Sequence, residues 1–170
     1  ARATVTVPIG LNQMIQAADL IFEGQVNKVQ TRSTADGSYL YTYVTYDVRK
    51  VISGSYDKSE LVLRFDGGTL DVDLKKIQKS MSPSSPPISQ ITRMEMVDAP
   101  KFKAGDHVFL FTSGNGHAAN PVVGFNQGSF SVTDAPGTGA KRIRNHSGHD
   151  VSVGKNGELI FLPPAQTKAH

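Results

Sequence analysis

The stretch from Tyr39 to Ile52, YLYTYVTYDVRKVI, constrains the fold more than any other part of the chain. Its residues alternate with a period of two, and most are β-branched or aromatic, as a half-buried strand requires. One face of that strand would carry Leu40, Thr42, Val44, Tyr46 and Val48. The other face would carry Tyr39, Tyr41, Tyr43, Thr45, Asp47 and Arg49. Strands of this length are common where one strand bends and serves both walls of a small barrel. The pattern therefore predicts a β fold.

The composition supports this prediction and excludes several classes of function. The 170 residues, with 16 Gly, 9 Pro and only 19% charged residues, indicate a single loop-rich β domain over residues 1–170. A formal net charge of +3 is too small to capture nucleic acid by its field alone. With no cysteine, the chain has no disulfide, no thiol catalysis and no Cys-based zinc site. No apolar run approaches the ~20 residues of a membrane span.

The first residues suggest a compartment. Ala1-Arg2-Ala3 has the small-x-small form of a signal-peptidase site, which predicts a processed, periplasmic or secreted protein. The alternative is that these residues carry no such meaning.

The remaining pattern is one of short elements separated by turns. Apolar residues spaced i, i+3, i+4 and i+7 predict a short helix over Gly10–Ala18. Alternation from Leu20 to Asn27 predicts a strand, and Asp36-Gly37 predicts the hairpin turn that joins it to the long strand. Further strands are expected at Leu61–Phe65, His107–Thr112, Val122–Phe125, Gly128–Thr133, Ala140–Asn145 and Leu159–Leu162.

Together these elements predict an all-β, Greek-key, OB-like partly open barrel with one short N-terminal helix. A Ser/Pro-rich insertion is expected at about residues 75–98, because prolines and serines at Ser80–Ser89 leave little to bury. The predicted core consists of Leu20, Phe22, Val26, Leu40, Val44, Tyr46, Val48, Leu61, Leu63, Val108, Leu110 and Phe130.

Five segments carry a family resemblance: ADLIFEGQV (18–26), YTYVTYDVRKVISG (41–54), LVLRFDGG (61–68), FKAGDHVFLF (102–111) and VVGFNQGSF (122–130). Their succession resembles a group of largely uncharacterised exported bacterial proteins with a barrel similar to that of netrin and tissue-inhibitor-of-metalloproteinase modules. The resemblance covers about three quarters of the chain and concerns turns and core strands, so it implies a fold and no particular activity. The animal modules reach a protease metal with an N-terminal cysteine. This chain has none, which argues against protease inhibition.

Two surface features are candidate binding sites. Tyr39, Tyr41 and Tyr43 form an aromatic stripe that could stack on bases or sugars, or could simply cover the sheet. Arg142, Arg144 and His146 would share one face of a strand and could bind an anion, or could mark a charged edge that prevents aggregation.

One cluster has a spacing suited to a metal. His146, His149 and Asp150 could converge on an ion in a turn, but two solvated histidines in a Gly-containing loop explain the same pattern. The sequence contains no nucleophile elbow, phosphate loop or HExxH helix. We expect no cofactor.

Three hypotheses follow. The first is an exported non-catalytic module that binds an extracellular or periplasmic protein or polysaccharide. The second is a small secreted metal-dependent hydrolase that uses His146, His149 and Asp150. The third is a weak binder of polyanions or single-stranded nucleic acid, although an exported location disfavours nucleic acid as the partner.

Overall fold

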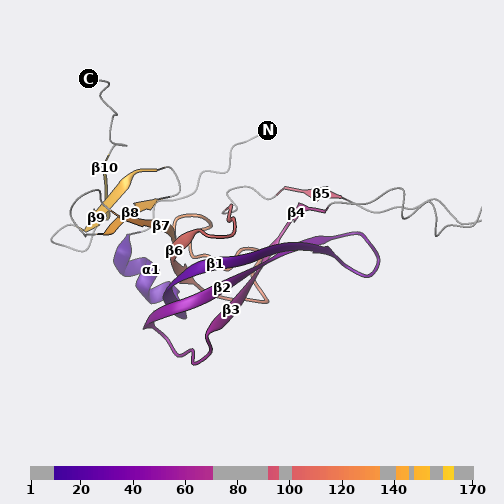
Figure 1. The fold of residues 1–170 in the computed structure, drawn as a ribbon, viewed down its shortest axis with the longest axis horizontal. Helices are drawn as coiled ribbons and strands as arrows, with labels where there is room; N and C mark the ends of the chain where they lie inside the picture. Colours follow the sequence, from indigo (N-terminus) through magenta and orange to yellow (C-terminus); the bar gives the residue numbers. More distant parts are fainter. Residues whose placement is uncertain are drawn as a thin grey trace, which may run out of the picture.

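The computed structural model describes residues 10–70, 92–95, 101–134, 141–145, 148–153 and 159–162, and it shows one short helix and a large antiparallel sheet (Figure 1). The elements are α1 (Leu11–Ala17), β1 (Leu20–Ser33), β2 (Leu40–Ser53), β3 (Glu60–Asp66), β4 (Gly68–Thr69), β5 (Arg93–Met94), β6 (His107–Thr112), β7 (Ser129–Asp134), β8 (Lys141–Asn145), β9 (Asp150–Val153) and β10 (Leu159–Leu162).

The large sheet has the order β10-β9-β8-β7-β6-β1-β2-β3. Strands β1, β2 and β3 follow one another, and β6 returns beside β1 after a long connection, which is the Greek-key order. Strands β3 and β10 are the two edges of this sheet, and no described ladder joins them. The all-β class is therefore confirmed, and the sheet is open and does not close into a barrel.

The β1–β2 hairpin is the longest unit of the sheet. The register runs from Ile21↔Ser53 to Ser33↔Leu40 and shifts at three places, one of them between Glu23 and Gly24. A Cβ at Gly24 would lie 2.6 Å from the backbone oxygen of Asp47, so only glycine fits this bulge. The bulge bends and twists the hairpin.

The predicted turn residues close this hairpin. Gly37 has φ 72°, in the left-handed region that favours glycine. Asp36 Oδ1 accepts hydrogen bonds from Thr34 Oγ1 (2.6 Å), Ser38 N (3.1 Å) and Ser38 Oγ (2.7 Å). These hydrogen bonds lower the pKa of Asp36 to about 2, with the Thr34 hydroxyl as the largest cause.

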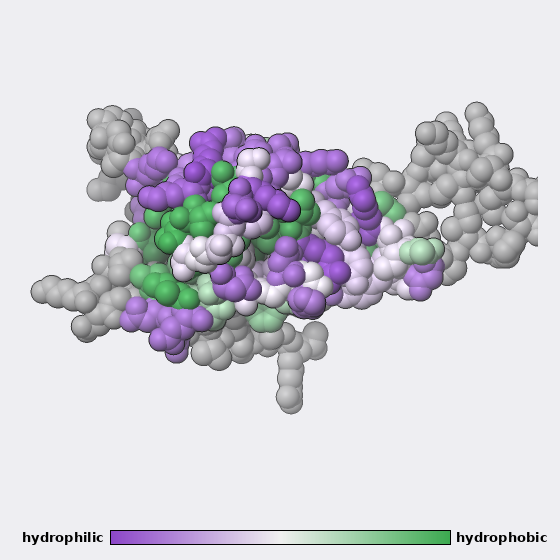
Figure 2. All heavy atoms as spheres, turned by 90° about the horizontal axis from the view of Figure 1, so that it is seen from below, coloured by the Kyte–Doolittle hydropathy of each residue, from purple (hydrophilic) through white to green (hydrophobic). Residues whose placement is uncertain are grey.

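The two faces of the sheet bury separate hydrophobic clusters. The first contains Phe22, Val26, Val44, Tyr46, Leu61, Leu63, Phe65, Val108, Leu110 and Val122. The second lies beneath α1 and contains Met14, Ile21, Phe111, Val123 and Phe130. Seen from below, hydrophobic side chains gather in the half of the molecule that holds α1, with hydrophilic residues around them (Figure 2).

Most predicted core positions are confirmed, and the differences have local causes. Leu20 and Val48 are only partly buried against the first cluster, and Phe130 belongs to the second. The strand predicted at Val122–Phe125 is wrong: Val122 forms an isolated bridge to Thr112, and the chain then turns. Gly124 (φ 67°) and Phe125 (φ 64°) are both left-handed there, which no extended strand permits. The Ser/Pro-rich insertion lies almost entirely outside the described residues.

Candidate functional site

The aromatic stripe lies on the face of β2 opposite the first hydrophobic cluster. Tyr41 and Tyr43 alternate with the buried residues Leu40 and Val44, and both rings are half-buried. In the register of the sheet, Tyr41 lies opposite Arg32 of β1, and Tyr43 lies opposite Arg64 of β3. The two tyrosines of β2 therefore have one arginine on each side, Arg32 on β1 and Arg64 on β3.

Each arginine packs diagonally over a tyrosine ring. The guanidinium carbon of Arg64 lies 4.5 Å from the centroid of Tyr41, and that of Arg32 lies 5.8 Å from the centroid of Tyr43. Both distances are within the range of attractive cation–π contacts. We call these four residues, Tyr41, Tyr43, Arg32 and Arg64, the Tyr–Arg face.

The third predicted tyrosine is held beside this face. The rings of Tyr39 and Tyr41 are tilted with centroids 5.1 Å apart, and the Tyr39 hydroxyl donates a hydrogen bond to Asp66 Oδ2. That hydrogen bond is the main reason why the pKa of Tyr39 rises to about 12. Tyr39 therefore remains a neutral hydrogen-bond donor at physiological pH.

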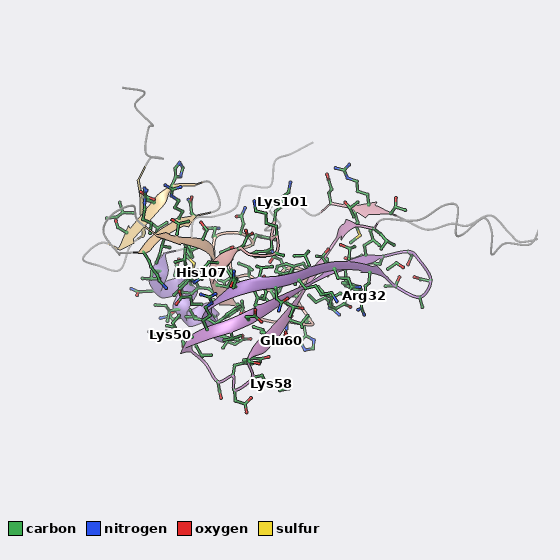
Figure 3. The ribbon with its side chains drawn as sticks, in the orientation of Figure 1. Arg32, Lys50, Lys58, Glu60, Lys101 and His107 are labelled. Carbon is green, nitrogen blue, oxygen red and sulfur yellow. The ribbon has the colours of Figure 1, made fainter. Side chains whose placement is uncertain are left out.

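Charges of both signs surround the Tyr–Arg face. Lys28 is exposed on β1, and Asp47 accepts hydrogen bonds from the Asn27 amide at 3.2 and 3.4 Å. In Figure 3, Arg32 lies below the β1–β2 ribbon, whereas Lys101, from the segment before β6, lies above it and lines the cavities described below, so Lys101 does not add to the charge of this face.

The predicted basic strip is largely neutralised. Arg142 and Arg144 of β8 share one face, and both donate to Asp150, Arg142 to Oδ2 and Arg144 Nε to Oδ1 at 3.1 Å. These contacts, that of Arg142 first, hold the pKa of Asp150 below its usual range. Two guanidiniums and one carboxylate leave a net charge of +1, which is weak attraction for an anion. His146, the third predicted member, lies outside the described residues.

The predicted metal cluster is only partly described. His149 is held by its backbone, because its N–H donates to Asn145 Oδ1 at 2.8 Å. Asp150 already bonds two guanidiniums, which would compete with a cation for its oxygens. No set of three potential metal ligands occurs within the described ranges, and His146 lies beyond them.

Sequence reasoning missed one polar cluster on the α1 side of the sheet. Glu23 Oε1 of β1 lies 2.7 Å from His107 Nε2 of β6 and 3.2 Å from Lys141 Nζ of β8. Partial burial raises the pKa of Glu23, but hydrogen bonds and charges from Lys141 and His107 outweigh that effect and lower it. The three residues come from three strands, so no sequence spacing could have indicated them.

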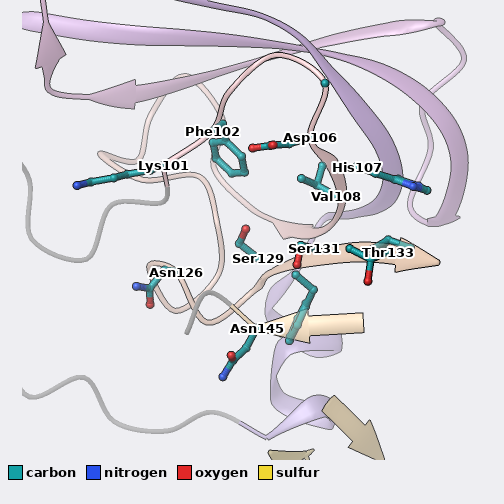
Figure 4. Close-up of a pocket in the computed structure, with 13 residues that line it drawn as sticks. Lys101, Phe102, Asp106, His107, Val108, Asn126, Ser129, Ser131, Thr133 and Asn145 are labelled. Atoms are coloured by element: carbon teal, nitrogen blue, oxygen red, sulfur yellow. The ribbon is translucent and has the colours of Figure 1, made fainter. Parts of the chain in front are cut away.

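Sequence reasoning also missed a cavity on the face of the sheet that carries the first hydrophobic cluster. A cavity of about 620 Å³ is lined by Lys101, Phe102 and residues 105–108, by Asn126, by residues 129–133 of β7 and by Asn145 (Figure 4). A second cavity, of about 790 Å³, lies between the distal part of the β1–β2 hairpin and β4–β5. Turn residues and alternating serines carry no distinctive motif, so the sequence offered no signal for either.

No protein-family model, curated protein or solved structure matches this chain. Within the described residues, no helix has the length and apolar character needed to cross a bilayer.

Proposed function

We propose that the chain is an exported, non-catalytic binding module whose partner is another protein. The observation that carries this proposal is the Tyr–Arg face, with Arg64 4.5 Å from the centroid of Tyr41. Tyrosine and arginine are the side chains, with tryptophan, that most often dominate the binding energy of protein interfaces. The resemblance to exported bacterial proteins concerns fold and location, and export remains part of the proposal.

The structural setting makes the face suitable for recognition. Both tyrosines stand on a strand that is paired on each side, and their backbones are fixed by β1 and β3. Half-buried rings have already lost much of their rotational freedom, so binding costs them little additional entropy. The diagonal arginines also limit the rings to a few orientations.

A protein fits this face better than a polysaccharide or polyanion does. Stacking on a sugar needs an open ring face, but Arg64 lies over Tyr41 and Tyr39 packs against it. A polyanion needs a concentration of positive charge, whereas Asp66 lies two residues from Arg64 on β3 and Asp47 lies four residues from Tyr43 on β2. Mixed charge around aromatic residues is typical of the centre and rim of a protein interface.

Photo-cross-linking can identify the partner. A benzoylphenylalanine replaces Val62, an exposed residue (44%) on the outer side of β3, and a control chain carries it at Asp57 in the β2–β3 connection. Both chains are expressed in the source cells, and adducts are identified by mass spectrometry. We expect a protein adduct that forms from position 62 and not from position 57.

The purified partner then allows a quantitative test by calorimetry. Tyr41→Ala and Arg64→Ala should each weaken binding about 30-fold, or about 2 kcal/mol, as expected for interface hot spots. Arg142→Ala removes the same charge far along the sheet and should change affinity less than about twofold. If Tyr41→Ala bound the partner with unchanged affinity, the Tyr–Arg face would not be the binding site. If the cross-linked adduct were a glycan and not a protein, the partner would be a polysaccharide and the protein-binding proposal would be wrong.

A further inference from the structure

The cavity of about 620 Å³ lies on the face of the sheet opposite the Tyr–Arg face. Ser129 and Ser131 of β7 lie opposite Leu110 and Val108, which belong to the first hydrophobic cluster. Tyr41 and Tyr43 point away from that cluster. The cavity is thus a separate place in the molecule, and its volume falls within the range of about 300–1,000 Å³ typical of small-molecule sites.

One wall of the cavity is a row of hydroxyl groups. Ser129, Ser131 and Thr133 alternate along β7, so they lie on one face of that strand. Their side chains make no hydrogen bond to any other described residue, and each hydroxyl can both donate and accept. Such a row can bond several hydroxyl groups of a ligand at the regular spacing of a strand.

The opposite wall combines a carboxylate and an aromatic ring. Figure 4 shows Phe102 and Asp106 across the cavity from Ser129 and Ser131, while His107 points away from it. Asp106 Oδ2 accepts a hydrogen bond from the backbone N–H of Lys103 at 3.0 Å, which fixes the carboxylate. Within the described part of the chain, Oδ1 has no hydrogen-bond partner and can accept one from a ligand.

Phe102 is itself held from behind by other rings. Its centroid lies 5.7 Å from that of Tyr46 in an edge-to-face arrangement and 5.6 Å from that of Phe65. A ring fixed in this way offers a flat apolar surface. Such surfaces pack against the C–H groups that one face of a sugar ring exposes.

From this arrangement we propose that the cavity binds the pyranose ring of a neutral sugar. Phe102 packs against the C–H face of the sugar, Asp106 accepts hydrogen bonds from its hydroxyl groups, and Ser129 and Ser131 bond hydroxyls on the other side. Lys101 and Asp106 carry opposite charges, so the lining does not favour a strongly charged ligand. The row of hydroxyl groups disfavours a purely apolar ligand, because these hydroxyls would lose their bound water and gain no hydrogen bond in its place.

The proposal is independent of the protein partner proposed above. A free monosaccharide and the end of a sugar chain are two sources of such a ring, because both present the same hydroxyl and C–H groups. Affinity in the millimolar range is expected for a single ring held by a few hydrogen bonds.

Backbone amide NMR of the full chain tests the proposal. The protein is titrated with the methyl glycosides of glucose, galactose and mannose and with N-acetylglucosamine. At least one should produce saturable shifts at residues 102–108 and 126–133. The trisaccharide of the sugar that binds is then compared with its single ring. Tighter binding of the trisaccharide assigns the site to a chain end, and equal binding assigns it to the ring alone.

Three variants define the site. Asp106→Asn should weaken sugar binding at least tenfold. Ser131→Ala alters an exposed side chain that bonds no other described residue, and it should weaken sugar binding about threefold. Tyr43→Phe, on the other face, should leave sugar affinity unchanged. The idea is overturned if none of the four sugars shifts these amides saturably, or if Ser131→Ala and Asp106→Asn both bind as the unaltered chain does.

Discussion

The side-chain carbonyl of Asn115 accepts a hydrogen bond from the backbone N–H of Arg64 at 3.0 Å. The Asn115 amide group in turn donates to the backbone oxygen of Val62 at 2.8 Å. One side chain thus reproduces the hydrogen bonds of a neighbouring strand on the open edge of β3. Asp66 N donates to Ala119 O at 2.8 Å, so the same loop covers the next position of that edge. These three bonded groups, Arg64 N, Val62 O and Asp66 N, are not available to pair with the edge strand of another chain.

Replacing Asn115 by alanine should expose this edge. Asn115→Ala removes two hydrogen bonds, each worth about 0.5–1.5 kcal/mol, so the free energy of unfolding should fall by about 1–3 kcal/mol in urea titrations. Sedimentation should also show self-association, which the unaltered chain should lack under the same conditions. Asn27→Ala is the control, because among the described residues the Asn27 side chain bonds the exposed Asp47 side chain alone, and it should cost less than about 0.5 kcal/mol. Equal effects of both substitutions would show that edge protection is not the role of Asn115.

Tyr46 and Tyr39 should respond in opposite ways to removal of the hydroxyl group. The Tyr46 hydroxyl is buried without a hydrogen-bond partner among the described residues, and burial, followed by the charge of Asp106, raises its pKa. Tyr46→Phe should therefore be neutral or stabilise the protein by up to about 1 kcal/mol. Tyr39→Phe loses the hydrogen bond to Asp66 and should destabilise it by about 1 kcal/mol. Thermal and urea unfolding of both variants measure the difference. A clear loss of stability in Tyr46→Phe would contradict the assignment of an unpaired hydroxyl.

The bulge at Gly24 should not tolerate a side chain. In Gly24→Ala the new Cβ would meet the Asp47 backbone oxygen at 2.6 Å, and backbone cannot move aside as a flexible side chain can. We expect a loss of about 1–3 kcal/mol in urea unfolding, as for other overpacked sites. Gly10→Ala provides the comparison, since a Cβ at Gly10 would have no atom within 4 Å, and should cost less than about 1 kcal/mol. A loss in Gly24→Ala no larger than that in Gly10→Ala would mean that the bulge can relax.

The hairpin turn should give the protein an acid-sensitive contribution to stability. The pKa of Asp36 falls from 3.8 to about 2 on folding, so folding favours its ionised form. That contribution is present above pH 3.8 and is lost as the pH falls through about 2. The difference in Tm between the unaltered chain and Asp36→Ala should therefore be largest above that window and shrink through it. Thr34→Val removes one hydrogen-bond donor and should shift the window to higher pH. A difference that stays constant from neutral to strongly acid pH would refute this account.

Local patterns predicted the sheet well. Alternation placed Leu40, Val44 and Tyr46 on the buried face of β2, and Asp36-Gly37 turns the hairpin as predicted, because both signals depend on neighbouring residues alone. The second cluster beneath α1 could not be predicted in the same way. Phe111 and Met14 meet only after β6 has paired with β1.

The candidate sites show the same limit. The tyrosine stripe was visible in one strand, but Arg32 and Arg64, which define the Tyr–Arg face, come from the strands on either side. Asp150 neutralises the predicted basic strip from another strand, so the sequence of β8 alone overstated its charge. Registers between strands, and not residue types, decided both outcomes.

The place of β1 in the Greek key has a consequence for the chain while it is being synthesised. Leu20 and Thr112, which bond across the β1–β6 pair, are 92 residues apart. At translation rates of about 5–20 residues per second, the second edge of β1 waits roughly 5–20 s for its partner. Hairpin formation with β2 takes only microseconds. For most of that interval the nascent chain exposes Phe22 and Val26 on a hairpin whose first strand has only one neighbour. A chaperone that binds the nascent chain would therefore bind at this hairpin.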